Sequence, residues 1–199
     1  MTKRSNFTQP FLALAAMSAL LFASACNAPA PPPPPPAANP DLAIAPSEYA
    51  DLSKMALEHL TKFEFDAWGA MLADTIQYNF PNGDEQTRTK LVGKTAVLDW
   101  WKNWQKTSGV QSMTTDRLIQ YSLDVHKHQL PGGLTGVYSY AYFSNKMVFN
   151  GNTVAIRMNF IAHFNKDKKI DRYFTYYDRA PIIEAMGGKN LLKAAPASK

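Results

Sequence analysis

Residues 136–178, GVYSYAYFSNKMVFNGNTVAIRMNFIAHFNKDKKIDRYFTYYD, predict three long β-strands, because they hold three long runs rich in β-branched and aromatic residues. Asn150-Gly151, between the first two runs, is a strong signal for a two-residue hairpin turn. It predicts that Phe149 pairs with Asn152. The residues that then share one face are Phe143, Asn145, Met147, Val154, Ile156 and Met158.

The second turn, at residues 165–169, sets the register of the last run. A two-residue loop would place Phe160 and Phe164 opposite polar residues. A three-residue loop with one residue in the left-handed conformation places them opposite Phe174 and Ile170. We therefore predict the three-residue loop, since it keeps one face of the sheet apolar.

This register predicts a core face and an outer face. The core face carries ten apolar residues: Val137, Ala141, Phe143, Met147, Ile156, Met158, Phe160, Phe164, Ile170 and Phe174. It also carries five polar ones: Ser139, Asn145, Arg172, Tyr176 and Asp178. Five tyrosines are expected on the outer face: Tyr138, Tyr140, Tyr142, Tyr173 and Tyr177. Tyrosine supplies contact area and a polar tip, which suits a protein interface.

Between residues 47 and 135, the apolar residues recur mostly at the spacing of a helix. We expect helices at about 47–64, 66–73 and 94–106, a short strand at 76–80, a turn at 81–84 and a further strand at about 116–128. Three N-terminal helices packed on one curved antiparallel sheet make an α+β domain.

This order of elements resembles the nuclear transport factor 2-like fold, in its SnoaL-like branch. The local matches are VGKTAVLDWW at 92–101 and HFNKDKKI at 163–170, followed by Tyr176-Tyr-Asp178. Lys168 stands where the family usually has glycine. The resemblance covers residues 47–187, and we assign the domain to 47–190 and a flexible tail to 191–199. It implies a cone-shaped domain with a cavity between the helices and the concave face of the sheet.

On the predicted register that cavity would be lined by Trp68, Tyr78, Trp101, Tyr121, Asn145, Arg172, Tyr176 and Asp178. Steroid-isomerase-type members of the superfamily use a carboxylate base and a hydroxyl donor, which Asp178 and Tyr176 could supply. An Arg172–Asp178 ion pair with no catalytic role is the alternative. The resemblance leaves the activity open, because the superfamily includes enzymes and binding modules.

Three functions therefore remain open: a domain that binds a small, mostly apolar or aromatic molecule, an isomerase, dehydratase or cyclase, and an interaction module. Members of this fold often dimerise through the sheet, so a homodimer through the tyrosine face is expected. We expect no metal and no cofactor; His126 and His128 lie on one side of a strand without a third ligand. No long basic run favours nucleic-acid binding.

The N-terminus reads as an export signal. Lys3 and Arg4 precede an apolar run, FLALAAMSALLFASA at 11–25, which is typical of a secretory signal peptide over residues 1–25. Ala-x-Ala before position 26 suits ordinary signal peptidase, but the same residues with Cys26 resemble a bacterial lipobox. We expect Cys26 to be lipid-attached, with an outer-membrane address. A periplasmic or secreted soluble protein is the alternative.

Residues 26–46 then form a linker. Eight of the chain's 14 prolines lie between Pro29 and Pro40. Such a segment adopts an extended polyproline II conformation, and at ~3.1 Å per residue it spans about 37 Å. It would hold the domain clear of the membrane surface.

Overall fold

The computed structural model describes residues 39–82, 88–127 and 133–194. The strands are β1 (Leu42–Ile44), β2 (Leu72–Asn79), β3 (Lys90–Val92), β4 (Val110–Val125), β5 (Gly136–Phe149), β6 (Asn152–Phe164) and β7 (Ile170–Tyr177). The helices are α2 (Glu48–Thr61), α3 (Phe65–Met71), α4 (Lys94–Ser108) and α5 (Ala180–Ala185), with a 3₁₀ helix, η1, at Leu191–Ala194. The domain is thus α+β.

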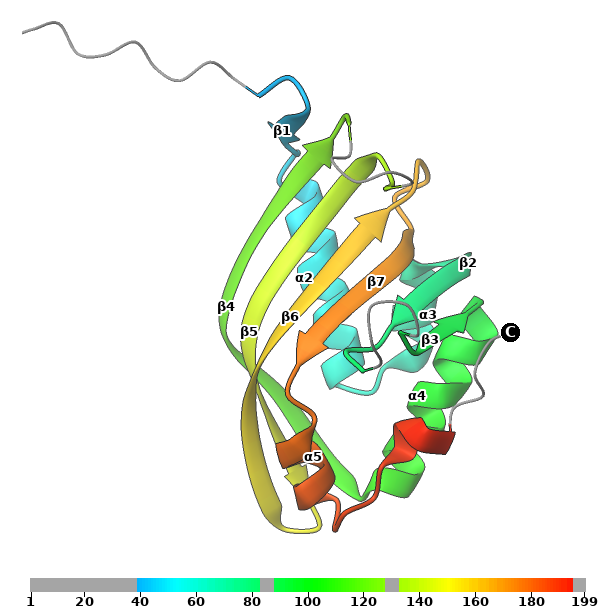
Figure 1. The fold of residues 1–199 in the computed structure, drawn as a ribbon, viewed down its shortest axis with the longest axis vertical. Helices are drawn as coiled ribbons and strands as arrows, with labels where there is room; N and C mark the ends of the chain where they lie inside the picture. The colour runs from blue at the N-terminus through cyan, green and yellow to red at the C-terminus, as the bar shows by residue number, and fades with distance from the viewer. Residues whose placement is uncertain (1–38, 83–87, 128–132, 195–199) are drawn as a thin grey trace, which may run out of the picture. The chain divides into compact units, whose positions relative to one another are not determined.

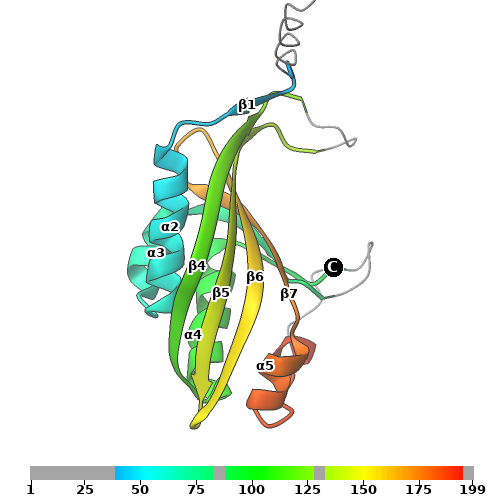
Figure 2. The same ribbon diagram turned by 90° about the vertical axis from the view of Figure 1, so that its left-hand side faces the viewer.

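The strands form one sheet in the order β1-β4-β5-β6-β7-β2-β3, and its long central strands curve strongly (Figure 1). Most neighbours are antiparallel, but β2 and β7 run parallel, with Tyr78 beside Tyr173. The expectation of an antiparallel sheet is therefore wrong at this pair. Helices α2 and α3 lie on one side of the sheet (Figure 2).

The β5–β6 hairpin confirms the predicted turn. Asn150 and Gly151 both have positive φ, +46° and +88°, and Phe149 pairs with Asn152. Positive φ at both central positions is what a type I′ turn requires, which is why Asn-Gly is so strong a signal. Asn145 consequently pairs with Ile156 and is buried among apolar side chains.

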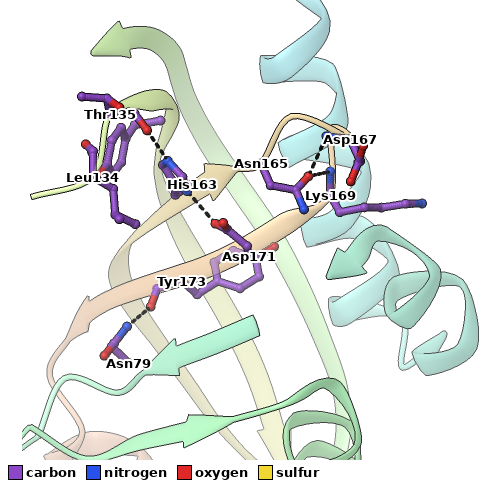
Figure 3. A network of polar contacts seen from close by, with 10 residues as sticks. Asn79, Leu134, Thr135, His163, Asn165, Asp167, Lys169, Asp171 and Tyr173 are labelled. Carbon is purple, nitrogen blue, oxygen red and sulfur yellow. Dashed lines mark hydrogen bonds and ion pairs between the residues drawn. The ribbon is translucent and has the colours of Figure 1, made fainter. Parts of the chain in front are cut away.

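The β6–β7 turn is also the predicted three-residue loop. Lys168 adopts the left-handed conformation with φ +55°, and Phe164 pairs with Ile170. Asn165 fixes the loop, since its side-chain oxygen accepts hydrogen bonds from the backbone N–H groups of Asp167 (2.9 Å) and Lys169 (3.0 Å) (Figure 3).

Directly after this turn, the register changes by one residue. Asp171 is an extra residue in β7, because His163 pairs with Arg172 while Phe164 pairs with Ile170. The Asp171 carboxylate contacts the His163 ring, so the bulge is held by a side-chain hydrogen bond (Figure 3). A one-residue shift exchanges the two faces of a strand.

Because of the bulge, the residues of β7 beyond Asp171 lie on the opposite faces from those predicted. Phe160 pairs with Thr175 and Ala162 with Tyr173, so Tyr173, Thr175 and Tyr177 lie on the core side. Arg172, Phe174 and Tyr176 are on the outer face. The prediction that Tyr173 and Tyr177 lie on the outer face is therefore wrong.

A second irregularity, in β4, also exchanges the two faces of its strand. Arg117 has φ +53°, and the β4–β5 register shifts between Asp116 and Ile119. Beyond it, Tyr121 pairs with Tyr140, and the two rings stack at 5.1 Å between centroids. Tyr121 thus belongs to the outer face and not to the core side.

The chain also folds further at both ends than the sequence suggested. Strand β1 lies within the segment expected to be linker, where it pairs with residues 123–125 of β4. Helix α5 begins after Asp178, whose carboxylate accepts a hydrogen bond from the N–H of Ala180 (2.9 Å). Leu192 of η1 is buried, although residues 191–199 were expected to be a flexible tail.

The predicted signal peptide, Cys26 and most of the proline-rich linker lie outside the described residues. Within 39–82, 88–127 and 133–194, none of the helices combines the length and the apolar character needed to cross a membrane.

Candidate functional site

A cavity lies between α2, α4, the strands β4–β6 and the C-terminal segment. Helix α4 presents three tryptophans to it, Trp100, Trp101 and Trp104. Four methionines also line it: Met113, Met147, Met158 and Met186. Tryptophan gives a large apolar surface, and methionine adapts its shape to a partner. The wall is therefore apolar and deformable.

The cavity is small as it stands, at about 50 Å³. That is room for about three or four water molecules, whereas pockets that hold drug-sized ligands measure roughly 300–1,000 Å³. A ligand larger than a few atoms must therefore displace methionine side chains or the C-terminal segment.

Two polar side chains in this wall are buried without a hydrogen-bond partner among the described residues. They are the side-chain oxygen of Asn145 and the indole N–H of Trp101. The amide nitrogen of Asn145 has only a weak contact, 3.8 Å from the sulfur of Met158. Thr115, the cross-strand neighbour of Asn145, carries a third unpartnered oxygen.

These orphan groups mark a place where hydrogen bonds are available. A buried polar group without a partner costs about 1–3 kcal/mol, so native structures hold few of them. Together, Asn145 offers an acceptor and Trp101 offers a donor within an apolar wall. The arrangement can hold a molecule with a mostly apolar body and a polar group.

The C-terminal segment closes one side of the cavity. Tyr177 ends β7, and Arg179 precedes α5; both line the cavity together with Ile182 of α5 and Leu192 of η1. Burial raises the pKa of the Tyr177 phenol to about 12, so it is neutral at pH 7. Burial lowers the pKa of the Arg179 guanidinium from its ordinary value, although arginine remains charged.

Of the eight residues predicted to line the cavity, the structure places Trp101 and Asn145 in its wall. Trp68 and Tyr78 lie beside it in the core, both with no exposed surface. Trp68 packs edge-on against Trp101, with 6.2 Å between ring centroids. These two residues support the wall and are not part of it.

The other four predicted residues lie elsewhere. The β4 irregularity puts Tyr121 on the outer face, and the β7 bulge does the same to Arg172 and Tyr176. Tyr176 is 48% exposed, and its hydroxyl accepts a hydrogen bond from Arg88. Asp178 is exposed, and its carboxylate accepts a hydrogen bond from the N–H of Ala180 at the start of α5. The predicted base and donor, Asp178 and Tyr176, are thus both outside the cavity, and an Arg172–Asp178 ion pair is not formed.

The contribution of the C-terminal residues to the cavity wall was not predicted from the sequence. Ile182 and Met186 are four residues apart, which is a helical spacing, and Pro181 suits the first turn of a helix. That signal was present, but a helix of six residues offers too few turns for its period to stand out.

Among the described residues, no group of three or more His, Cys, Asp or Glu side chains is arranged to hold a metal ion. His126 lies near Asp124, with 3.5 Å between Nε2 and Oδ2, and both side chains are partly exposed. His128, the other half of the predicted pair, lies outside the described residues.

The fold is that of known structures. The chain is similar to a proposed polyketide cyclase from Xanthomonas campestris pv. campestris, with a TM-score of 0.54 and 15% identity over 70% of this chain and 97% of that one. It is similar to a proposed isomerase from Bacillus subtilis (TM-score 0.51, 19% identity, 72% and 96% covered). A third is a proposed SnoaL-like polyketide cyclase from Shewanella denitrificans OS-217 (TM-score 0.50, 10% identity, 72% and 100% covered).

No family model matches the sequence, and no curated protein matches it. At these identities the likeness establishes the fold alone: the domain has the SnoaL-like, nuclear transport factor 2-like fold.

Proposed function

We propose that this protein is a lipoprotein of the bacterial cell envelope whose folded domain binds a small, mostly apolar molecule in the cavity. One observation carries the binding proposal: Asn145 is 5% exposed and keeps an unpartnered oxygen inside a wall of methionines and tryptophans. A side chain with no ligand to meet would be better replaced there by an apolar one of the same size.

Binding is favoured over turnover by the residues in the wall. The isomerase and cyclase chemistry for which the structural neighbours are named depends on acid and base groups at the substrate. Among the described residues, the wall contains no Asp, Glu or His. Its titratable groups are Tyr177 and Arg179, and neither serves as a base at pH 7.

Binding is tested with N-phenyl-1-naphthylamine, a neutral fluorophore that brightens in apolar sites. We expect the full chain carrying Cys26→Ser, which needs no detergent, to bind it, and we expect Met113→Trp in the same chain, which fills the cavity, to abolish the signal. Thr114→Trp is the matched control, because Thr114 is exposed and next to Met113. Equal fluorescence from both variants and the wild type would show that the probe binds outside the cavity.

The envelope part of the proposal rests on the N-terminal sequence. An apolar run followed by a single cysteine and a proline-rich spacer is the layout of a lipid-anchored protein. Mass spectrometry of the N-terminal peptide tests it: diacylglycerol on Cys26 is expected, and Cys26→Ser should move the protein from the membrane fraction to the soluble one. A mature N-terminus with an unmodified Cys26 would contradict the anchor.

The outer face supports a second candidate, a homodimer through the sheet. Ile119, Tyr121, Tyr142 and Tyr176 are large side chains between 43% and 67% exposed on this face. Large exposed apolar surface is typical of interaction sites. Asp116 and Lys146, on adjacent strands of the same face, offer opposite charges to a second copy related by a two-fold axis.

Light scattering at micromolar concentration tests the dimer. The wild type is expected at twice the monomer mass, and Tyr121→Glu, which places charge on the face, should give a monomer. A wild-type monomer at these concentrations would remove this candidate without affecting the cavity.

A further inference from the structure

We propose that Arg179 is an anion-binding residue of the cavity, so that the ligand is an anionic amphiphile: a mostly apolar body that ends in a carboxylate or a similar group. This inference rests on the proposed binding function and specifies the class of ligand.

Arg179 is the one charged residue among the described residues that line the cavity. Its position is fixed by the chain: it follows the end of β7, and its carbonyl accepts a hydrogen bond from the N–H of Ile183 in α5 (3.0 Å). The guanidinium is half-buried, and its Nη2 donates to the side-chain oxygen of Asn190 (2.6 Å). The guanidinium is thus held at the cavity wall by a neutral partner.

Arg179 has no carboxylate partner among the residues that the structure describes. None of the ion pairs formed by the described residues includes Arg179. The carboxylate of its neighbour Asp178 accepts a hydrogen bond from the N–H of Ala180, and Tyr177 is a neutral phenol at pH 7. By contrast, Arg117 on the open surface lies 3.7 Å from the carboxylate of Asp116.

A cation that is partly removed from water without a counter-charge is costly, and proteins normally pair such groups. An arginine fork offers two parallel hydrogen bonds to a carboxylate. A ligand that places its carboxylate on Arg179 and its apolar body against Trp104 and Met186 would satisfy both the charge and the apolar wall.

The test compares 4-phenylbutyrate with 4-phenylbutan-1-ol, which have the same carbon skeleton and differ in charge. Binding is measured by calorimetry on the full chain carrying Cys26→Ser, so that no detergent competes. We expect the acid to bind about ten- to a hundred-fold more tightly than the alcohol, the range for a hydrogen bond to a charged group. Arg179→Gln should remove this preference and leave the alcohol's affinity unchanged.

Three controls make the result decisive. Arg179→Lys keeps the charge and is expected to keep part of the preference. Arg157→Gln removes a charge from the exposed outer face and is expected to change nothing. Circular dichroism checks that each variant is folded.

The outcomes separate the two proposals. If acid and alcohol bind equally and Arg179→Gln affects neither, the anion site is wrong while cavity binding stands. If a folded protein binds neither compound at millimolar concentration, the cavity itself is not a site for such molecules and both proposals fail.

Discussion

The carboxylate of Asp171 lies 2.5 Å from Nδ1 of His163, and this contact closes the bulge at which β7 exchanges its faces. The other ring nitrogen, Nε2, donates to the carbonyl of Thr135 at 3.0 Å (Figure 3). His163 is 5% exposed. Its ring therefore links the end of β6 to the start of β7, through Asp171, and to the residue before β5, Thr135. The placement of Tyr173 and Tyr177 on the core side depends on this junction.

Removing the carboxylate should therefore destabilise the whole domain. We expect Asp171→Ala to lower the free energy of unfolding by about 2 kcal/mol, since a partly buried hydrogen bond to a charged group is lost. Asp171→Asn keeps an acceptor and should cost less. Urea denaturation measures both. The control is Asp124→Asn at the exposed contact with His126, which should cost under about 0.5 kcal/mol; equal losses at both sites would contradict this role of Asp171.

Lys168 is predicted to be strained. Its φ of +55° suits glycine, while its ammonium forms an exposed ion pair with Glu48 at 2.7 Å. Lys168→Ala loses the ion pair and keeps the strain, whereas Lys168→Gly loses both. We expect the glycine variant to be more stable than the alanine variant by about 1 kcal/mol in thermal or urea unfolding. Identical stabilities would mean that the turn carries no strain at this residue.

We expect the Asn145 side chain to lower the stability of the domain and to contribute to ligand binding. Asn145→Leu removes an unpartnered polar group and is expected to raise the free energy of unfolding by about 1 kcal/mol. The same change should weaken retention of a bound ligand. Ser122→Ala is the control, because Ser122 is also buried with an unpartnered oxygen but lies outside the cavity wall. A loss of stability in Asn145→Leu would show that the amide already has a partner.

Alkaline pH should unfold the protein through its buried tyrosines. Burial raises the pKa of Tyr177 to about 12 and also raises the pKa values of Tyr78 and Tyr173. In the unfolded chain a tyrosine ionises near pH 10, so above that pH the unfolded state binds fewer protons than the native state. Stability is thus complete below about pH 10 and is lost as the pH rises towards 12.

The change in the free energy of unfolding with pH can be measured. Each such tyrosine contributes up to about 1.4 kcal/mol per pH unit in that window. Tyr177→Phe should flatten the dependence of the urea midpoint on pH between 10 and 11.5 relative to the wild type. An unchanged slope would indicate that Tyr177 is solvated in the native state.

The elements that depend on local chemistry could be predicted from the sequence. Asn150-Gly151 and the loop at 165–169 set their own geometry, so both turns and the pairing next to them are confirmed. The pairing at the Asn150-Gly151 turn determines which residues of β5 face the core, and Asn145 is one of them.

The site was only partly predictable because two irregularities depend on distant contacts. The alternation in IDRYFTYY does not show that Asp171 is an extra residue; the partner that holds it there, His163, belongs to another strand. A one-residue error then assigned Arg172 and Tyr176 to the wrong face. The shift at Arg117 moved Tyr121 in the same way. The parallel pairing of β2 with β7 joins segments about ninety residues apart and leaves no local signal.

Native mass spectrometry of the full-length protein, purified gently from its own host, is the most direct test of ligand binding in the cavity. We expect a retained small-molecule mass in the wild type and in Thr114→Trp, and its loss in Met113→Trp, which fills the cavity. Detection of only ligand-free protein in all three, under conditions that keep the fold intact, would contradict a binding function for this cavity.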